Sequence, residues 1–330
     1  MHVVIPVAGL GTRLRPHTWS KPKPLVTVAG KPILGHVLDR LNRLPLQRVV
    51  FVTGYLGEQI EEYVRTHYRF DAVFVEQPEP LGQSHALLQA KGLVHGPTLV
   101  VFPDLVFDAD LEAVLTCPWD GIVFVKEVDD PRRFGVVIVE DGRIVQLVEK
   151  PAQTVSRLAM VGVYYFHDFG DLIAAIEQQI AEGRKRGNEY YLAEAIQILI
   201  DRGRTIVAQP VSVWEDCGTV EALLETNRFL LDRQAGPQPS FPTAVVVPPV
   251  VIDPTARIEH AVIGPYVSIG PGAVVSHAIV TDSIIDEEAT INGVMLHRSI
   301  VGRRARVLGD FVRVNVGDSS EITFSGRDGA

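Results

Sequence analysis

A six-residue period near the C-terminal end restricts the fold of this chain more than any other feature. Aliphatic or small side chains recur at this step in two interleaved series, Val267, Ala273, Ile279, Ile285 and Ile291 in one and Ile263, Ile269 and Val275 in the other. One inward-facing aliphatic side chain per hexapeptide is the signature of a parallel β-helix, in which each hexapeptide forms one face of a coil. The sequence therefore predicts a short β-helix of roughly three coils over residues 250–310.

The first half of the chain alternates between strand-like and helix-like segments. The short runs rich in β-branched residues are 2–8, 48–54, 72–77 and 98–104. Between them, apolar residues recur at helical spacing, as at Leu34, Val37, Leu38 and Leu41. This alternation predicts a Rossmann-like α/β domain, with a mainly parallel sheet covered by helices on both faces.

Residues 135–151 break that rhythm, because Asp141-Gly142 between two apolar runs is a strong signal for an antiparallel hairpin. We therefore expect a mixed, mainly parallel sheet. Helical patterns follow at 170–180, 192–203 and 220–234. A Pro-rich stretch at 235–243 favours a domain boundary. The predicted division is an α/β domain at 1–235, a linker at 236–249, the repeat at 250–310 and a polar tail at 311–330.

Composition and charge exclude several classes of protein. The chain has 330 residues, of which 46% are hydrophobic and 22% charged, a balance typical of soluble globular proteins. We expect neither a membrane span nor a signal peptide, because no apolar run reaches about 18 residues and no basic segment precedes the apolar N-terminus. Two cysteines exclude a disulfide framework and favour the reducing cytoplasm. A net charge of -9 argues against nucleic-acid binding.

Residues 9–25, GLGTRLRPHTWSKPKPL, carry four basic side chains in an otherwise acidic chain. Gly9 and Gly11 follow the first predicted strand, where backbone N–H groups can form an anion-binding nest. Together with that nest, Arg13 and Lys23 could hold a polyphosphate. The dinucleotide fingerprint fails because its third glycine is missing, and the Gly-Lys-Ser/Thr of a P-loop is missing as well. A basic surface loop is the alternative interpretation.

Three polar features fall at the carboxyl ends of predicted strands. Gln77 ends the third strand, Asp104 ends the fourth, and the basic loop follows the first. Ligands of open parallel sheets bind at this edge, and a carboxylate beside a phosphate-binding loop suits Mg²⁺. Taken alone, Asp104 also fits a helix cap or a turn. Asp108 and Asp110 are predicted to cap the helix that follows.

Two later segments carry further candidates. Glu149 and Lys150 leave the predicted hairpin, where they could hold a polyol and its phosphate or form a solvated ion pair. Asp216 offers either a second carboxylate for the site or an N-terminal helix cap. Cys217 has no evident histidine partner, so we expect a small buried side chain and not a nucleophile.

Taken together, these residues resemble the sugar-1-phosphate nucleotidylyltransferase family over residues 1 to about 235. The family signature Gly-x-Gly-Thr-Arg-Leu-x-Pro…Pro-Lys-Pro-Leu is present between Gly9 and Leu25. The later motifs follow in the family's order, as Gln77…Leu81-Gly82, Pro103-Asp104, Phe134-Gly135-Val136, Glu149-Lys150-Pro151 and Trp214…Asp216…Gly218-Thr219. Some members carry an appended left-handed β-helix, so the resemblance implies that handedness for the repeat.

The resemblance implies a role for each matching residue. The implied nucleotide-binding set is Ala8, Gly9, Leu10, Gly11, Thr12, Arg13, Gln77 and Gly82, with Gln77 and the backbone of Gly82 at the base. The implied catalytic set is Arg13, Lys23 and Asp104, and the implied sugar-phosphate set is Gly135, Glu149 and Lys150. A Mg²⁺ cofactor would be held by Asp104 and Asp216.

The implied reaction transfers a nucleotidyl group from an NTP to a sugar 1-phosphate and releases pyrophosphate. The glutamine–glycine pair at the base favours dTTP or UTP, and glucose 1-phosphate is the expected acceptor. The alternatives are a member that forms GDP-mannose or UDP-N-acetylglucosamine, and a non-catalytic sensor of nucleotide sugars. A glycosyltransferase with Asp108 and Asp110 as a metal-binding pair is a further rival, but it would not need Arg13 and Lys23 arranged for a triphosphate.

The predicted β-helix has two interpretations. We expect an oligomerisation or regulatory element, since the flat faces of a β-helix tend to pack against a copy of the same chain, and therefore a homo-oligomer. The alternative is a second, acyl-transferring activity with His260, His277 or His297 as candidate bases. Three coils are short for such a site.

Overall fold

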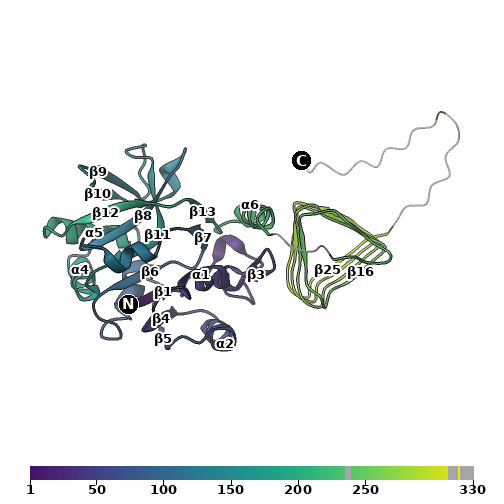
Figure 1. Ribbon diagram of the computed structural model, residues 1–330, viewed down its shortest axis with the longest axis horizontal. Helices are drawn as coiled ribbons and strands as arrows, with labels where there is room; N and C mark the ends of the chain where they lie inside the picture. Colours follow the sequence, from purple (N-terminus) through teal and green to yellow (C-terminus); the bar gives the residue numbers. More distant parts are fainter. Residues whose placement is uncertain (235–238, 311–318, 320–330) are drawn as a thin grey trace.

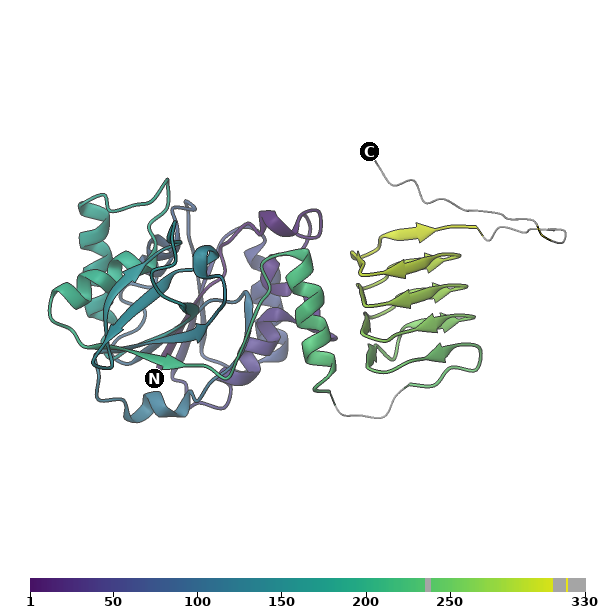
Figure 2. The same ribbon diagram turned by 90° about the horizontal axis from the view of Figure 1, so that it is seen from above.

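The computed structural model describes residues 1–234, 239–310 and 319. Figure 1 shows a body of helices and strands beside a triangular stack of strands, and Figure 2 shows the layers of that stack edge-on. Within the described residues, no helix is both long and apolar enough to cross a bilayer. The predicted tail at 311–330 lies outside them, apart from Ser319.

One half of the main sheet is parallel, as the alternating pattern predicts. Strands β5, β4, β1 and β6 are neighbours in that order and pair in parallel. Their bounds are Ala72–Glu76, Arg48–Thr53, His2–Pro6 and Thr98–Val101. Their carboxyl ends therefore lie at one edge of the sheet, where loops can converge on a ligand.

The other half of the nine-stranded sheet contains the antiparallel strands. The order continues from β6 through β11, β8, β12, β10 and β9. Their bounds are Leu158–Phe166, Gly121–Glu127, Ile206–Pro210, Arg143–Val148 and Val136–Glu140. The expected hairpin is β9–β10, turned by Asp141 and Gly142 at φ 47° and 78°. The predicted mixed sheet is confirmed.

Helices cover both faces of this sheet. On one face lie α1 and α2, whose Leu38 and Ile60 are fully buried. On the other lie α3, α4 and α5, whose Ile176 and Ile196 are fully buried. The helix bounds are Ile33–Leu41, Gly57–His67, Gln83–Leu88, Phe169–Ala181 and Leu192–Asp201. Because apolar side chains are buried against both faces, polar functional groups can gather only at the edge of the sheet.

A separate two-stranded sheet includes the strand that follows β6 along the chain. Strand β7 (Leu105–Asp108) pairs antiparallel with β13 (Val213–Asp216). The prediction that Asp108 caps a helix is wrong. Asp108 is the last residue of strand β7, and its carboxylate pairs with Arg40 at 2.9 Å. Asp110 does accept from the amides of residues 112 and 113, but the element that it caps is the 3-10 turn η3 (Glu112–Thr116).

The C-terminal part is a stack of three four-stranded parallel sheets, consistent with the predicted left-handed β-helix (Figure 2). One sheet is β14, β17, β20 and β23 (Val245–Val246, Val262–Ile263, Ile279–Thr281, Met295–His297). The next is β15, β18, β21 and β24 (Val250–Ile252, Val267–Ile269, Ser283–Ile285, Ile300–Val301). The last is β16, β19, β22 and β25 (Arg257–Glu259, Val274–Ser276, Thr290–Asn292, Arg306–Leu308). The stack has four layers where the repeat predicted roughly three coils, and its first strand lies in the predicted linker.

The coils are shorter than three full hexapeptides. Val262 pairs with Ile279, and Ile279 pairs with Met295, so successive coils advance by 17 and 16 residues. The six-residue series therefore loses register. Ile279 points outward and is 38% exposed, while Val280 is fully buried in the interior. The prediction that Ile279 faces inward is wrong for this reason.

Helix α6 (Val220–Leu231) lies between the α/β body and the β-helix (Figure 2). Its buried Asn227 accepts hydrogen bonds from the Ala29 amide at 2.9 Å and from the Ser268 hydroxyl at 2.6 Å. Arg228, one residue further, pairs with Asp282 at 2.8 Å. Polar contacts of α6 thus reach both the N-terminal segment and the strand stack.

Candidate active site

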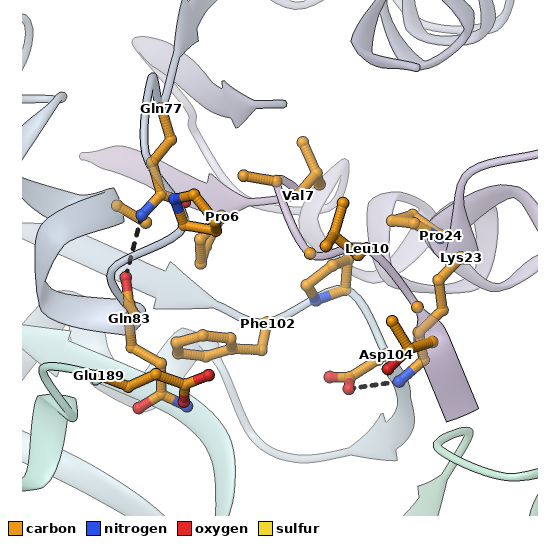
Figure 3. Close-up of a pocket in the computed structure, with 18 residues that line it drawn as sticks. Pro6, Val7, Leu10, Lys23, Pro24, Gln77, Gln83, Phe102, Asp104 and Glu189 are labelled. Carbon is orange, nitrogen blue, oxygen red and sulfur yellow. Dashed lines mark hydrogen bonds and ion pairs between the residues drawn. The ribbon is translucent and has the colours of Figure 1, made fainter. Parts of the chain in front are cut away.

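Two adjoining cavities lie at the carboxyl edge of the sheet. The first, of about 520 Å³, is lined by residues 6–12 and by Lys23, Gln77 and Gly82, among others (Figure 3). The second, of about 510 Å³, is lined by residues that include Arg13, Gly135, Glu149, Lys150 and Asp216. Both cavities are lined by Gln83, Phe102, Asp104 and Glu189. Every predicted site residue therefore lies on one of two connected cavities.

The loop after β1 offers unpaired backbone donors to the first cavity. Within the described residues, the amides of Gly9, Leu10, Gly11 and Thr12 donate no hydrogen bond. Gly11 has φ +61°, and a Cβ there would lie 3.0 Å from the Lys23 side chain. A Cβ on Gly9 would meet nothing within 4 Å. This loop has the form of an anion nest: consecutive N–H groups with open space in front of them.

Lys23 also lines this first cavity, beside the loop. Its Nζ lies 2.6 Å from Oδ2 of Asp104, and its side chain is 11% exposed (Figure 3). Burial alone would raise the pKa of Asp104, but Lys23 and, to a smaller degree, Arg13 bring it below the ordinary value. Asp104 is therefore an ionised carboxylate on the wall that the two cavities share.

Asp216 is the second carboxylate of the site. The Cys217 amide donates to the Asp104 carbonyl at 3.0 Å, which brings β13 to the end of β6. Burial and the neighbouring Asp104 raise the pKa of Asp216. Within the described part of the chain, its carboxylate makes no hydrogen bond or ion pair. A Cβ on Gly218 would lie 3.0 Å from both Asp216 oxygens, so this glycine leaves the carboxylate room.

Gln77 and Gly82 are brought together as predicted. The buried Gln77 amide donates from Nε2 to the Gly82 carbonyl at 3.1 Å and lies 3.1 Å from Nδ1 of His85. Gly82 has φ +102°, and a Cβ there would lie 2.7 Å from the Tyr190 amide. Since Tyr190 exchanges backbone hydrogen bonds with residues 81 and 84, this contact also brings Glu189 to the cavities.

Gly135, Glu149 and Lys150 flank the strands of the β9–β10 hairpin and line the second cavity. A Cβ on Gly135 would lie 2.6 Å from Oε2 of Glu149 and 2.1 Å from Cε of Met160. Burial raises the pKa of Glu149, and Lys150 opposes that shift. The Lys150 Nζ lies 3.4 Å from the Tyr191 hydroxyl and 3.8 Å from Oε1 of Glu149. The cavity thus presents a buried carboxylate with an ammonium beside it, a pair suited to hydroxyl and phosphate groups.

The four basic side chains of the segment 9–25 do not all lie at the candidate active site. Arg13 and Lys23 line the cavities. Arg15 instead stacks on the Trp19 ring, 3.9 Å from its centroid, and Lys21 pairs with Asp286 of the β-helix at 2.6 Å. Only two of the four basic residues therefore supply positive charge to the cavities.

Several lining residues were not predicted from the sequence. Phe102 forms part of the wall shared by the two cavities, and Arg133 and Tyr191 line the second. Phe102 and Arg133 lie within two residues of predicted site residues, and that proximity is the signal that could have indicated them. Tyr191 reaches the site only through the nonlocal contact of residues 81–84 with Tyr190.

Cys217 is buried, as predicted. Its Sγ lies 3.7 Å from the Thr226 hydroxyl. Burial raises the pKa of the thiol to about 12. Because the thiolate is the reactive form of cysteine, this side chain is a packing residue and not a nucleophile.

Comparisons with known proteins match this site-bearing part of the chain. The chain is 37% identical over 235 residues to the bifunctional protein GlmU of Methanocaldococcus jannaschii, which is 71% of this chain and 55% of GlmU. It is also 37% identical to the UTP–glucose-1-phosphate uridylyltransferase AglF of Haloferax volcanii, over 71% of this chain and 98% of AglF. Identity to the glucose-1-phosphate thymidylyltransferase of Streptomyces antibioticus is 33%, over 70% and 67% of the two chains. The chain spans about half the length of the GlmU proteins it matches.

The fold comparison agrees with the topology. A crystal structure of UDP-glucose pyrophosphorylase complexed with UDP-glucose aligns with a TM-score of 0.62 at 23% identity, covering 71% of this chain and 99% of that one. The family description "Nucleotidyl transferase" matches residues 2–233, which contain both cavities but not the strand stack. On these grounds the chain belongs to the nucleotidyl transferase family.

Proposed function

We propose that this protein transfers a nucleotidyl group from dTTP or UTP to glucose 1-phosphate, forming a nucleotide sugar and pyrophosphate. The observation that carries the proposal is the pair of connected cavities. One presents unpaired amides and Lys23, as a triphosphate requires. The other presents Glu149 beside Lys150, as a sugar phosphate requires. They meet at Asp104, where the reacting phosphorus atom would lie.

The proposed chemistry needs no general base. A phosphate oxygen of the sugar 1-phosphate attacks the α-phosphorus of the NTP, and the bond from that phosphorus to the pyrophosphate oxygen breaks. The nucleophile is already an anion, and no proton has to move. Catalysis then consists of holding two polyanions in line and neutralising their charge. Arg13 and Lys23 would perform that neutralisation from opposite cavities.

The two carboxylates fit a Mg²⁺ ion bound with substrate. Within the described residues no group of three or more His, Cys, Asp or Glu side chains is placed to hold a metal. Mg²⁺ needs only one or two carboxylates when phosphate oxygens and water complete its shell. Asp104 and Asp216 supply two, and Asp216 has no cation of its own within the described residues. When bound, the ion would withdraw charge from the reacting phosphate.

The choice of a pyrimidine nucleotide rests on two supports. Gln77, just after strand β5, and Gly82, just before helix α3, lie together on the first cavity and offer polar groups to a base. The names of two relatives specify uridylyl and thymidylyl transfer to glucose 1-phosphate. Formation of UDP-N-acetylglucosamine or GDP-mannose are the alternative outcomes within the same reaction class.

The experiment is pyrophosphate release by the full chain with Mg²⁺, crossing dTTP, UTP, GTP, CTP and ATP with glucose-, N-acetylglucosamine- and mannose-1-phosphate. We expect release that needs both substrates and is fastest with dTTP or UTP and glucose 1-phosphate. Binding of a nucleotide sugar without release from any pair would replace the proposal with a non-catalytic sensor.

We also propose a homo-oligomer formed through the β-helix. Val245, Val262, Ile279 and Met295 pair in register along one sheet and form a continuous outward stripe. Met295 is 74% exposed and Val245 is 59% exposed. Such a ladder of aliphatic side chains on a flat face suits burial against a second copy.

The oligomer is tested by light scattering on the full chain and on Met295→Glu. We expect a mass above that of the 36.2 kDa monomer for the parent and a monomer for the variant. Leu308→Glu is the control, because Leu308 is also exposed but lies on another sheet. A monomeric parent, or dissociation in both variants alike, would count against this stripe.

A further inference from the structure

The side-chain amide of Gln77, on the first cavity, has a fixed orientation. Gln77 is 9% exposed, and its Nε2 donates to the Gly82 carbonyl at 3.1 Å, the dashed line at Gln77 in Figure 3. Because a carbonyl oxygen can only accept, the amide must turn its nitrogen and not its oxygen toward Gly82. The same Nε2 lies 3.1 Å from Nδ1 of His85. Both N–H groups of Gln77 are therefore used inside the protein.

This contact also fixes the tautomer of His85. An amide nitrogen only donates, so Nδ1 of His85 must accept and the ring proton must lie on Nε2. His85 lines neither cavity of the candidate active site. It can therefore act on a bound nucleotide only through Gln77, as a positioning residue.

Only the oxygen of the Gln77 amide is left for a ligand. In the part of the chain that the structure describes, Oε1 accepts no hydrogen bond, and it is not one of the fully buried polar atoms without a partner. It is therefore open to the cavity that Gln77 lines. The Gly82 amide also donates no hydrogen bond within the described residues. The cavity thus presents a hydrogen-bond acceptor and a donor close together.

That pair of groups matches one kind of base edge. Uracil and thymine carry an N–H donor next to a carbonyl acceptor, and guanine carries the same pair. Cytosine and adenine carry a ring-nitrogen acceptor next to an amino donor instead. With Gln77 in its observed orientation, cytosine would place a lone pair against Oε1 and its amino group against the Gly82 amide. A site built on hydrogen bonds rejects such a ligand, because buried polar groups are left unpaired.

The imidazole of His85 is what makes the reversed amide unfavourable. In the reversed orientation, Oε1 of Gln77 would face the Gly82 carbonyl and the Nδ1 lone pair, which are both acceptors. Removal of the imidazole abolishes one of these two repulsions. It also leaves one N–H of the observed orientation without a partner in a buried place. Both changes make the reversed amide, which suits cytosine, easier to reach.

The backbones of both residues are anchored independently of any ligand. The Gln77 amide N–H donates to the Thr53 carbonyl at 2.8 Å, at the end of β4. His85 lies in α3, where the Ser84 amide donates to the Tyr190 carbonyl at 3.0 Å. The contact between Gln77 and His85 is therefore set by the fold.

We propose that His85 determines the base specificity of this enzyme by holding the Gln77 amide in one orientation. Its Nδ1 keeps Oε1 of Gln77 toward the base, so the site takes uracil, thymine or guanine and rejects cytosine and adenine. This role rests on the proposed function, because that function makes the first cavity the nucleotide site.

The test is calorimetry of UTP and CTP with Mg²⁺ on the full chain, without a sugar phosphate. The two nucleotides share their triphosphate and ribose, so the ratio of their dissociation constants reports on the base edge. We expect the parent to bind UTP at least about tenfold more tightly than CTP, and His85→Leu to lower that ratio to about threefold or less. His85→Asn should keep most of the parent ratio, because its side-chain oxygen can accept where Nδ1 does.

Gln89→Leu is the matched control. Gln89 donates to the His85 carbonyl at 3.0 Å and lines neither cavity, so its loss disturbs the end of α3 and spares the imidazole. The ratio should not change in this variant. If His85 only packed, His85→Leu would weaken both nucleotides alike, and the unchanged ratio would overturn the proposal. Equal binding of UTP and CTP by the parent, loss of the ratio in Gln89→Leu, or no retention in His85→Asn would overturn it as well.

Nitrogen NMR of the imidazole in the parent reads the tautomer directly, with the signal of His85 assigned by its absence in His85→Asn. We expect Nδ1 without a proton and Nε2 with one, and a proton on Nδ1 would overturn the proposal.

Pyrophosphate release separates this role from the proposed function. Release with an unchanged ratio in His85→Leu removes only the role of His85. A lowered ratio in that variant, without release from any substrate pair, removes only the proposed transfer. Binding of neither nucleotide removes both.

Discussion

Single residues set the dimensions of the second cavity, and Gly135 shows this most directly. A Cβ at this position would lie 2.6 Å from the Glu149 carboxylate and 2.1 Å from the Met160 methyl group. Both neighbours are the ends of flexible side chains, so the chain would fold but Glu149 would have to move. The backbone conformation of Gly135 is not left-handed, and it is the space that excludes a side chain.

Gly135→Ala is therefore expected to raise KM for the sugar phosphate about tenfold or more while KM for the NTP changes little. One displaced hydrogen-bonding group at a substrate accounts for a change of that size. Steady-state kinetics with each substrate varied in turn measures the split, and thermal unfolding checks the fold. An equal effect on both substrates would argue against a sugar-side role.

Arg13 and Arg15 offer a matched pair of cations two residues apart. Arg13 lines the second cavity, and Arg15 stacks on Trp19 outside both cavities. We expect Arg13→Ala to lower kcat about 100-fold or more, the scale for loss of a group that stabilises transition-state charge. Arg15→Ala should retain nearly full activity. Similar losses of kcat in the two variants would show that the total positive charge of the segment matters more than the position of Arg13 in the cavity.

The raised pKa of Asp216 predicts the acid limb of the pH profile. Burial and Asp104 favour the protonated form, so Asp216 should take up a proton at a higher pH than an ordinary aspartate. Activity should therefore fall as the pH decreases through that raised value, and higher Mg²⁺ should shift the limb to lower pH because metal and proton compete. The check is kcat/KM against pH at two Mg²⁺ concentrations. A limb that does not respond to Mg²⁺ would assign it to another group.

At the scale of elements, the strands, helices and hairpin of the α/β domain could be predicted because each has a local cause. The β-branched runs, the helical spacing and the Asp141-Gly142 turn all act within a few residues. The β7–β13 pair could not be predicted, since it joins Leu105 to Asp216 across more than a hundred residues. The same holds for Tyr191, which a distant backbone contact brings to the site.

The register of the β-helix gives a prediction at this scale. Val280→Ala removes buried aliphatic volume and should destabilise the protein by about 2 kcal/mol. Its neighbour Ile279 points outward, so Ile279→Ala should change stability by less than about 0.5 kcal/mol when both substitutions are made in the Met295→Glu variant, where the proposed contact with a second copy is absent. Urea unfolding, followed by a probe of the C-terminal strands, compares the two. A larger loss of stability in Ile279→Ala than in Val280→Ala would instead support the six-residue register that the sequence pattern indicated.

For the whole molecule, the junction between the α/β body and the β-helix is a built interface. A buried apolar cluster combines Leu14 and Val28 of the N-terminal segment, Leu223 of α6 and Ile284 of the β-helix. This arrangement explains why the ion pair of Lys21 could not be predicted, whereas Lys23 lies at the active site as expected. Lys21 pairs with Asp286, which belongs to a domain that begins more than two hundred residues later.

Asn227 is the polar centre of that junction. Asn227→Ala would leave the Ala29 amide and the Ser268 hydroxyl without their acceptor in a buried place. We expect a loss of about 2–4 kcal/mol in the free energy of unfolding. Asn292→Ala is the control, because Asn292 makes one exposed side-chain contact, with Ser276. Equal and small effects in both would mean that the junction adds little to stability.

The wall shared by the two cavities has a kinetic consequence. Each substrate would touch one cavity, whereas a nucleotide sugar would span Phe102 and Asp104 and touch both at once. The product would then leave more slowly than either substrate. Release of the nucleotide sugar, and not formation of the new bond, would then limit turnover, so kcat should fall with added viscogen. The enzyme should also catalyse the reverse reaction, pyrophosphorolysis, readily.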